Sequence, residues 1–227
     1  MPLTLGILAL LMLLFGPQLW VQWVLRRHAR PRDDFPGTGG QFARHLLDRL
    51  DLGDVQVVTT EAGDHYDPRT RQVALSPEHH NGRSLTAVVV AAHEVGHALQ
   101  HAQGDGWFRL RQRLVGLAQG AQMLGNLLFV AAPLIGLVTR TPVAGWLTLA
   151  GALAAFGASA LVHLVTLPVE LDASFRRALP LLEAGRYLPP PDRPAARSIL
   201  RAAALTYVAA SLASLLNLWR WGRLLRH

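Results

Sequence analysis

The stretch His93-Glu94-Val95-Gly96-His97 brings two imidazoles and a carboxylate together in the sequence. Positions i and i+4 lie one above the other on a helix, so His93 and His97 can bind the same metal ion. Glu94 then leans toward a water molecule on that ion. Zinc lowers the pKa of such a water to about 7, and a glutamate that accepts its proton leaves a nucleophile. The pattern therefore indicates metal-assisted hydrolysis with Glu94 as general base, and the alternative is two histidines that merely pack or face solvent.

A catalytic zinc site needs a third protein ligand, and Glu170 is the candidate that the sequence favours. The chain has no cysteine, which excludes thiolate ligands, disulfides and a cysteine nucleophile. Glu170 directly follows an apolar run. If the two apolar runs before it form a hairpin through a bilayer, the chain returns at Glu170 to the side of the His93 helix. The alternative is an acidic cap in the first turn of an interfacial helix behind Pro168.

Three further side chains are candidates for stabilising the charge that develops on the substrate oxygen. Tyr66 and His65 lie in a turn-rich stretch and are rival donors that no spacing ranks. His163 lies seven residues before Glu170, hence on the same helical face. An ionisable group inside an apolar run is a functional candidate, although for His163 we favour a hydrogen bond between helices.

Two residues that follow Glu170 are candidates for orienting the histidines. On a continuous helix Ser174 shares the face of Glu170, whereas Asp172 points about 160° away. Asp172 would therefore reach the site only if the helix is distorted there. A salt bridge from Asp172 to Arg176 is the alternative.

Long apolar runs indicate an integral membrane protein. Hydrophobic residues make up 51% of the 227 residues and charged residues 16%, which is too apolar for an ordinary soluble domain. Residues 1–25, 114–139 and 141–169 contain no Asp, Glu, Lys or Arg, and each run is long enough to cross a bilayer as a helix. Residues 202–219 are a weaker candidate, either a tilted span or an interfacial helix. We therefore expect a mainly α, polytopic fold with three or four transmembrane helices.

The polar segments between these spans are expected to carry the chemistry. Residues 26–113 would form a small α+β insertion against the membrane, with strands at 55–60 and 71–75 and an active-site helix over about 84–103. The strand at 71–75 is a candidate edge strand for pairing with an extended substrate. The predicted order is an N-terminal transmembrane helix (1–25), the membrane-apposed catalytic segment (26–113), a transmembrane hairpin (114–169), a third-ligand helix with a Pro-rich linker at 188–194 (170–201), and a weak fourth helix with a basic tail (202–227).

The placement of the basic residues predicts the orientation in the membrane. All 22 basic residues are arginines, and the formal net charge is +7. Arginines cluster after the first apolar run, before the second and after the third. By the positive-inside rule this places residues 26–113 and Glu170 on the cytoplasmic face of the inner cell membrane. Because these arginines lie beside spans and are not interleaved with aromatic residues, nucleic-acid binding is not expected.

Four separated motifs resemble one family, in the same order along nearly the whole chain. They are Asp64-His65-Tyr66-Asp67-Pro68-Arg69-Thr70, Leu75-Ser76-Pro77 with Asn81-Gly82-Arg83-Ser84, Ala91-Ala92-His93-Glu94-Val95-Gly96-His97-Ala98-Leu99-Gln100, and Val165-Thr166-Leu167-Pro168-Val169-Glu170 with Asp172-Ala173-Ser174. In these motifs the sequence resembles the bacterial membrane-embedded neutral zinc metallopeptidases of the YugP type. The resemblance implies a gluzincin-like endopeptidase with a zincin-like fold around the active-site helix. It also implies one catalytic Zn²⁺ held by His93, His97 and Glu170, with Glu94 as base.

The sequence is similar, more distantly, to the heat-shock and prenyl-protein membrane metallopeptidases. In those families an aspartate follows the third-ligand glutamate by four residues. Here that position is Ser174, and the aspartate is Asp172.

These features together predict a membrane-bound zinc metallo-endopeptidase. If Glu170 binds zinc, the ion must lie near the membrane interface, so we expect protein or peptide substrates that are associated with the lipid bilayer. The alternative is a non-catalytic membrane scaffold or chaperone that keeps zinc for its structure, which a fourth protein ligand would favour. The sequence leaves the physiological substrate, the cleavage preference and the oligomeric state open.

Overall fold

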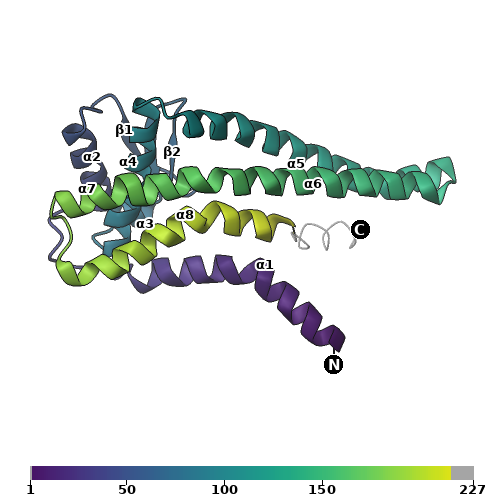
Figure 1. Cartoon of the computed structure of the whole chain (residues 1–227), viewed down its shortest axis with the longest axis horizontal. Helices are drawn as coiled ribbons and strands as arrows, with labels where there is room; N and C mark the ends of the chain where they lie inside the picture. Colours follow the sequence, from purple (N-terminus) through teal and green to yellow (C-terminus); the bar gives the residue numbers. More distant parts are fainter. Residues whose placement is uncertain (1, 216–227) are drawn as a thin grey trace. The chain divides into compact units, whose positions relative to one another are not determined.

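The computed structural model describes the backbone of residues 2–215, and some side chains in the helices, including that of His163, lie outside the described part. The described chain is mainly helical with one small sheet, as predicted (Figure 1). Its helices are α1 (Pro2–Arg27), α2 (Gly39–Arg49), α3 (Pro77–Asn81), α4 (Leu85–Ala102), α5 (Gly106–Thr139), α6 (Pro142–Leu171), the π-helix η1 (Asp172–Ala178), α7 (Leu179–Ala184), the 3₁₀ turn η2 (Pro190–Asp192) and α8 (Arg193–Leu215). Its strands are β1 (Gln56–Thr59), β2 (His65–Asp67) and β3 (Gln72–Leu75).

The chain divides into two compact units. The first consists of Met1–Arg109 and Leu167–Thr206, and the second of Leu110–Thr166 and Tyr207–His227. All the predicted metal ligands belong to the first unit.

Helix α4 begins and ends where the sequence predicts the active-site helix. The hydroxyl of Ser84 caps it by accepting a hydrogen bond from the backbone N–H of Ala87 at 3.1 Å. The chain leaves the helix before Gly104, whose φ of +64° is strained for any residue with a side chain. Half of the residues of α4 are Ala or Val and most of the helix is buried, so α4 is the central helix of the first unit.

The small sheet differs from the prediction in two respects. Its strand order is β1-β3-β2, with β1 parallel and β2 antiparallel to β3. The turn-rich stretch after β1 therefore contains a strand, β2, in which Tyr66 pairs with Val73. The predicted edge strand at 71–75 is instead the central strand, because both of its sides are occupied. An extended substrate could add only to β1 or β2.

Two short helices pack beside α4 and support it. Helix α2 opens with a capping box, in which Thr38 accepts from the N–H of Gln41 and the Gln41 side chain accepts from the N–H of Thr38. Its buried face, which includes Ala43, Leu46 and Leu47, packs against α4. Helix α3 follows β3 and also packs against α4.

The π-helix η1 packs against another side of α4. Gly96 makes this contact possible, since a Cβ built on Gly96 would lie 2.7 Å from the carbonyl oxygen of Ala173. A π-helix widens the turn relative to an α-helix, and such segments are frequent at functional sites. The sequence predicts that Asp172 reaches the site only if the helix is distorted there. The π-helix η1 is such a distortion.

The predicted Pro-rich linker at 188–194 is shorter in the structure. Residues Pro190–Asp192 form η2, and α8 begins at Arg193. Pro194 lies in the first turn of α8, where proline is tolerated because its missing N–H would have no helical partner. Helix α8 then buries Ala196, Ile199 and Leu200.

Helices α5 and α6 form a hairpin in the second unit (Figure 1). Glycines permit their close approach, since a Cβ on Gly145 would lie 3.2 Å from the carbonyl oxygen of Ala132. Among the described residues, one helix, α5, is long and apolar enough to cross a membrane, and Pro142–Ala155 of α6 is a shorter apolar stretch. One of the three or four predicted spans thus has support from the helix itself, and the others stay predictions.

Candidate metal centre

His93, His97 and Glu170 lie together inside the first unit. The Nε2 atoms of His93 and His97 are 3.4 and 3.1 Å from Oε2 of Glu170. The two histidines are 3% exposed and Glu170 is fully buried. Their ligand atoms all lie within 4.8 Å of one another, so a single ion could contact all three. The structure therefore brings together the three residues that the sequence selected.

Ser174 determines which nitrogen of His93 carries the proton. The Nδ1 atom of His93 lies 3.0 Å from Oγ of Ser174, and that hydroxyl donates its single proton to the carbonyl oxygen of Leu200 at 3.0 Å. The oxygen of Ser174 must then accept from His93. This assignment places the ring proton on Nδ1 and leaves a lone pair on Nε2, which faces Glu170.

Gln100 determines in the same way which nitrogen of His97 carries the proton. The amide nitrogen of Gln100 donates to the carbonyl oxygen of Val169 at 3.0 Å and to Oδ2 of Asp172 at 2.8 Å. Both amide protons are thus used, and Oε1 is left to accept from Nδ1 of His97 at 2.9 Å. The Nε2 atom of His97 again keeps its lone pair toward Glu170.

Asp172 reaches the centre through Gln100, not by contact with a ligand. Its main ionic partner is Arg177, whose Nε donates to Oδ2 at 2.8 Å, whereas the predicted salt bridge to Arg176 spans 4.0 Å. Burial alone would raise the pKa of Asp172, but the hydrogen bonds from Arg177 and Gln100 outweigh it and lower the pKa. Arg177 also pairs with Asp105 at 3.3 Å, which joins η1 to the segment after α4.

The donor set fits a divalent metal ion. Two imidazole nitrogens without protons and a carboxylate oxygen converge in a buried space. Electron-pair donors in such an arrangement repel one another, and a cation among them removes that repulsion. Two imidazoles and one carboxylate are also a ligand set of known catalytic zinc sites, in which the fourth position is open.

Glu94 lies on α4 beside this cluster and is 6% exposed. It follows His93 directly, so its side chain is turned by about 100° from that of His93 around the helix axis. It also interacts electrostatically with His79 of α3. The carboxylate is therefore next to the ligands without being one of the three that converge.

Two of the three predicted oxyanion donors, Tyr66 and His65, have hydrogen-bond partners in the structure. The hydroxyl of Tyr66 lies 2.8 Å from Nδ1 of His101, one turn beyond the cluster on α4, and burial raises the pKa of Tyr66. The Nδ1 atom of His65 lies 2.8 Å from the carbonyl oxygen of Gly63. The side chain of His163 lies outside the described part of the structure.

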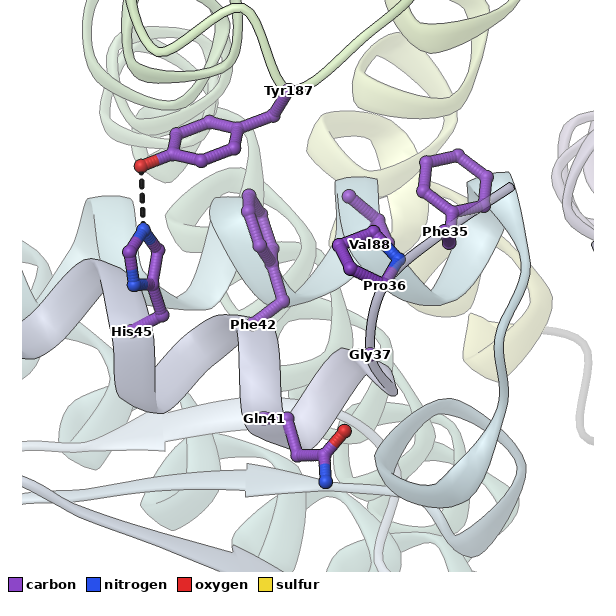
Figure 2. Close-up of a pocket in the computed structure, with 8 residues that line it drawn as sticks. All are labelled: Phe35, Pro36, Gly37, Gln41, Phe42, His45, Val88 and Tyr187. Carbon is purple, nitrogen blue, oxygen red and sulfur yellow. Dashed lines mark hydrogen bonds between the residues drawn. The ribbon is translucent and has the colours of Figure 1, made fainter. Parts of the chain in front are cut away.

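Two of the cavities in the described part of the first unit are relevant to the site. One, of about 500 Å³, adjoins the metal cluster, because Gln100 and Asp172 form part of its wall together with Trp107 and Phe175. The other, of about 400 Å³, is largely apolar, and a hydrogen bond of 2.7 Å joins the Tyr187 hydroxyl to His45 at its border (Figure 2). Of these two cavities, the first shares Gln100 and Asp172 with the network around the ligands.

Gln100 contacts the metal centre but is not among the residues predicted from the sequence. Gln100 lies three residues after His97, which places the two side chains on the same side of α4. It also ends the motif that contains His93 and His97, so its position in the sequence indicated that it lies near the ligands. Its role depends on Asp172 and on the backbone of Val169, which are far away in the sequence. Only the folded arrangement shows that these groups meet.

Two histidines from one helix and a distal glutamate, with a second glutamate beside them, are a set of residues found in zinc-dependent metallopeptidases. The chain belongs to the family described as "Putative neutral zinc metallopeptidase", whose model matches residues 3–226. It is 37% identical to the "Putative membrane protease YugP" of Bacillus subtilis (strain 168) over 212 residues, which cover 91% of this chain and 90% of that protein. No solved structure matches the chain significantly.

Proposed function

We propose that this chain is a membrane-bound zinc metallo-endopeptidase that cleaves protein or peptide substrates associated with the membrane. The observation that carries the proposal is the buried cluster of His93, His97 and Glu170, with Glu94 beside it on α4. Membership of a zinc metallopeptidase family supports the metal and the reaction. The name of the Bacillus relative, a membrane protease, supports the location.

The side chains divide into those that hold the metal and one that moves a proton. His93, His97 and Glu170 would be the ligands, and bound zinc would polarise the scissile carbonyl and promote ionisation of a water molecule. The carboxylate of Glu94 accepts the proton of the attacking water as the water oxygen bonds to the carbonyl carbon. It then delivers that proton to the amine nitrogen when the C–N bond breaks.

The membrane part of the proposal rests on the apolar helices. Helix α5 has the length and composition of a span, and the sequence adds candidates at 1–25, 141–169 and 202–219. We propose a multi-pass protein of the inner cell membrane with its active site on the cytoplasmic face. Glu170 lies at the end of the apolar helix α6, which favours substrates held at the bilayer.

A test compares one peptide in two forms, free in solution and joined to a membrane anchor, with the full-length protein in liposomes. We expect about one zinc per chain, cleavage that a chelator abolishes and zinc restores, and a faster rate for the anchored peptide. Equal rates for the two forms would contradict the membrane-associated substrate. Stoichiometric zinc without cleavage of a panel of anchored peptides would favour the scaffold.

A further inference from the structure

A chain of hydrogen bonds leads from His97 away from the metal cluster. The Nδ1 atom of His97 donates to Oε1 of Gln100 at 2.9 Å, and the amide nitrogen of Gln100 donates to Oδ2 of Asp172 at 2.8 Å. The same Oδ2 atom accepts a second hydrogen bond, from Nε of Arg177 at 2.8 Å. Arg177 is therefore the third residue behind the metal ligand, and its side chain is only 14% exposed.

The orientation of the Gln100 amide depends on Asp172. A reversed amide would turn its oxygen toward Oδ2 of Asp172 and toward the carbonyl oxygen of Val169, which are both acceptors. It would also turn its NH₂ group toward Nδ1 of His97, so the imidazole proton would have to move to Nε2, the atom that faces Glu170. A protonated Nε2 has no lone pair for a metal ion. The position of Asp172 therefore keeps His97 in the form that can bind metal.

Arg177 holds the carboxylate of Asp172 in this position. In a π-helix the backbone hydrogen bonds join residues i and i+5, so the wide turn of η1 brings Arg177 over Asp172. Arg176 lies 4.0 Å from the other oxygen of Asp172, and its side chain is 84% exposed. The remaining donors of Arg177 bind the side chains of Gln103 and Asp105. The guanidinium is thus fixed between η1 and the segment that follows α4.

We propose that Arg177 is a positioning residue of the metal centre, which fixes Asp172 and, through the Gln100 amide, keeps the proton of His97 on Nδ1. This inference rests on the proposed function as a zinc peptidase. Arg177 moves no proton and breaks no bond in the reaction. A purely structural tie between η1 and the segment after α4 would act through Asp105 and would leave the imidazole proton where it is.

The experiment measures the zinc dissociation constant of the full-length protein by competition with a chelator, in Arg177→Gln and in the matched control Arg176→Gln. Each substitution removes one arginine of η1, but only the first removes the hydrogen bond to Oδ2 of Asp172. Loss of a group that orients a metal ligand weakens metal binding by about 10–100-fold, and we expect about 10-fold for Arg177→Gln because it acts through Gln100. Equal affinities of the two variants would overturn the proposal.

Asp105→Asn separates the positioning role from a structural one. It removes the charge that pairs with Arg177 at 3.3 Å but keeps an oxygen for the N–H of Phe108. We expect a lower melting temperature with wild-type zinc affinity. A loss of zinc affinity as large as that in Arg177→Gln would show that Arg177 acts through the structural tie, which contradicts the proposal.

Asp172→Ala tests whether Arg177 acts through Asp172. We expect it to weaken zinc binding at least as much as Arg177→Gln does. The double variant should then bind zinc no more weakly than Asp172→Ala alone, because the link is already missing. Losses that add in the double variant would contradict the proposed route.

The tautomer of His97 provides a measurement on the zinc-free protein, which a purely structural role would not change. With ¹⁵N-labelled histidine, the His97 signals are those that disappear in His97→Gln. We expect the proton on Nδ1 in the wild type and on either nitrogen in Arg177→Gln. If Arg177→Gln does not fold, Asp172→Ala replaces it in both measurements with the same expected result. An unchanged tautomer would overturn the role of Arg177.

These outcomes can be told apart from a failure of the proposed function. A wild-type protein that binds zinc, together with an Arg177→Gln variant of equal zinc affinity, contradicts only the role of Arg177. A wild-type protein that binds no zinc contradicts the proposed zinc peptidase itself.

Discussion

The hydroxyl of Ser174 has a role in the metal centre that a substitution can isolate. In Ser174→Ala, Nδ1 of His93 loses its acceptor, and the ring is free to change tautomer or rotate. Loss of a group that orients a metal ligand weakens metal binding by about 10–100-fold, so we expect a fall of that size in zinc affinity. Zinc titration against a competing chelator measures it. Ser198→Ala on α8 is the control, and equal affinities of the two variants would contradict the assignment.

The Asp64 and His79 pair, whose Oδ2 and Nδ1 atoms lie 2.7 Å apart, makes the stability of the fold depend on pH. The pKa of His79 is raised above its ordinary 6.5. Its contribution to the stability of the fold is therefore complete below pH 6.5, and it is lost as the pH rises through the raised pKa. The pKa of Asp64 is lowered below its ordinary 3.8. Its contribution to stability is therefore complete above pH 3.8, and it is lost as the pH falls through the lowered pKa. Both residues stabilise the fold fully between pH 3.8 and pH 6.5.

Thermal melts of wild type and Asp64→Asn across pH therefore test the pair. We expect the variant to melt several degrees lower between the two ordinary pKa values, and the gap to narrow at both more acidic and more alkaline pH. A gap that does not change with pH would show that the pair is not ionised in the fold.

At the scale of the elements, the contact between α4 and η1 sets the position of Glu170 and Ser174 relative to the histidines. In Gly96→Ala the new Cβ would lie 2.7 Å from the backbone oxygen of Ala173, so η1 must move. We expect the variant to lose most of its zinc and its activity while it keeps its helical content. Gly116→Ala on α5 is the control, because a Cβ there has no neighbour within 4 Å. Wild-type zinc content in Gly96→Ala would contradict this account.

The elements that could be predicted from the sequence are those with strong local signals. Ser84, the apolar residues after it and Gly104 define α4, and the two strand-like runs at 55–60 and 71–75 contain β1 and β3. Strand β2 was missed because its three residues lie between turn-forming ones and pair only through β3. The start of the π-helix was not predicted, since it depends on how η1 packs against α4.

In the candidate site, too, the residues predicted from the sequence are those marked by a local pattern. The i and i+4 spacing gave His93 and His97, and the end of an apolar run gave Glu170. Gln100 and Arg177 were not selected, because Gln100 meets Asp172 only in the fold and Arg177 reaches Asp172 only across the wide turn of η1. A polar residue is therefore hard to assign from sequence when its function depends on a distant partner.

At the scale of the whole molecule, the arginine distribution predicts the orientation in the membrane. Reporter fusions at Asp51 and Arg140 test it, because the first lies in the catalytic segment and the second between α5 and α6. We expect a cytoplasmic signal at Asp51 and an external one at Arg140, since arginines cluster beside the catalytic segment and Arg140 stands alone. Signals on the same side at both positions would contradict a hairpin that spans the membrane.

The most direct test of the central claim, that Glu94 is the base of a zinc peptidase, is the paired zinc content and proteolytic rate of Glu94→Gln. The glutamine keeps the size of the side chain and leaves His93, His97 and Glu170 in place, but it cannot accept the proton. We predict wild-type zinc content with a rate lower by about 10²–10⁴-fold, as expected for loss of a general base. A Glu94→Gln protein that loses its zinc, or that cleaves at the wild-type rate, would contradict the claim.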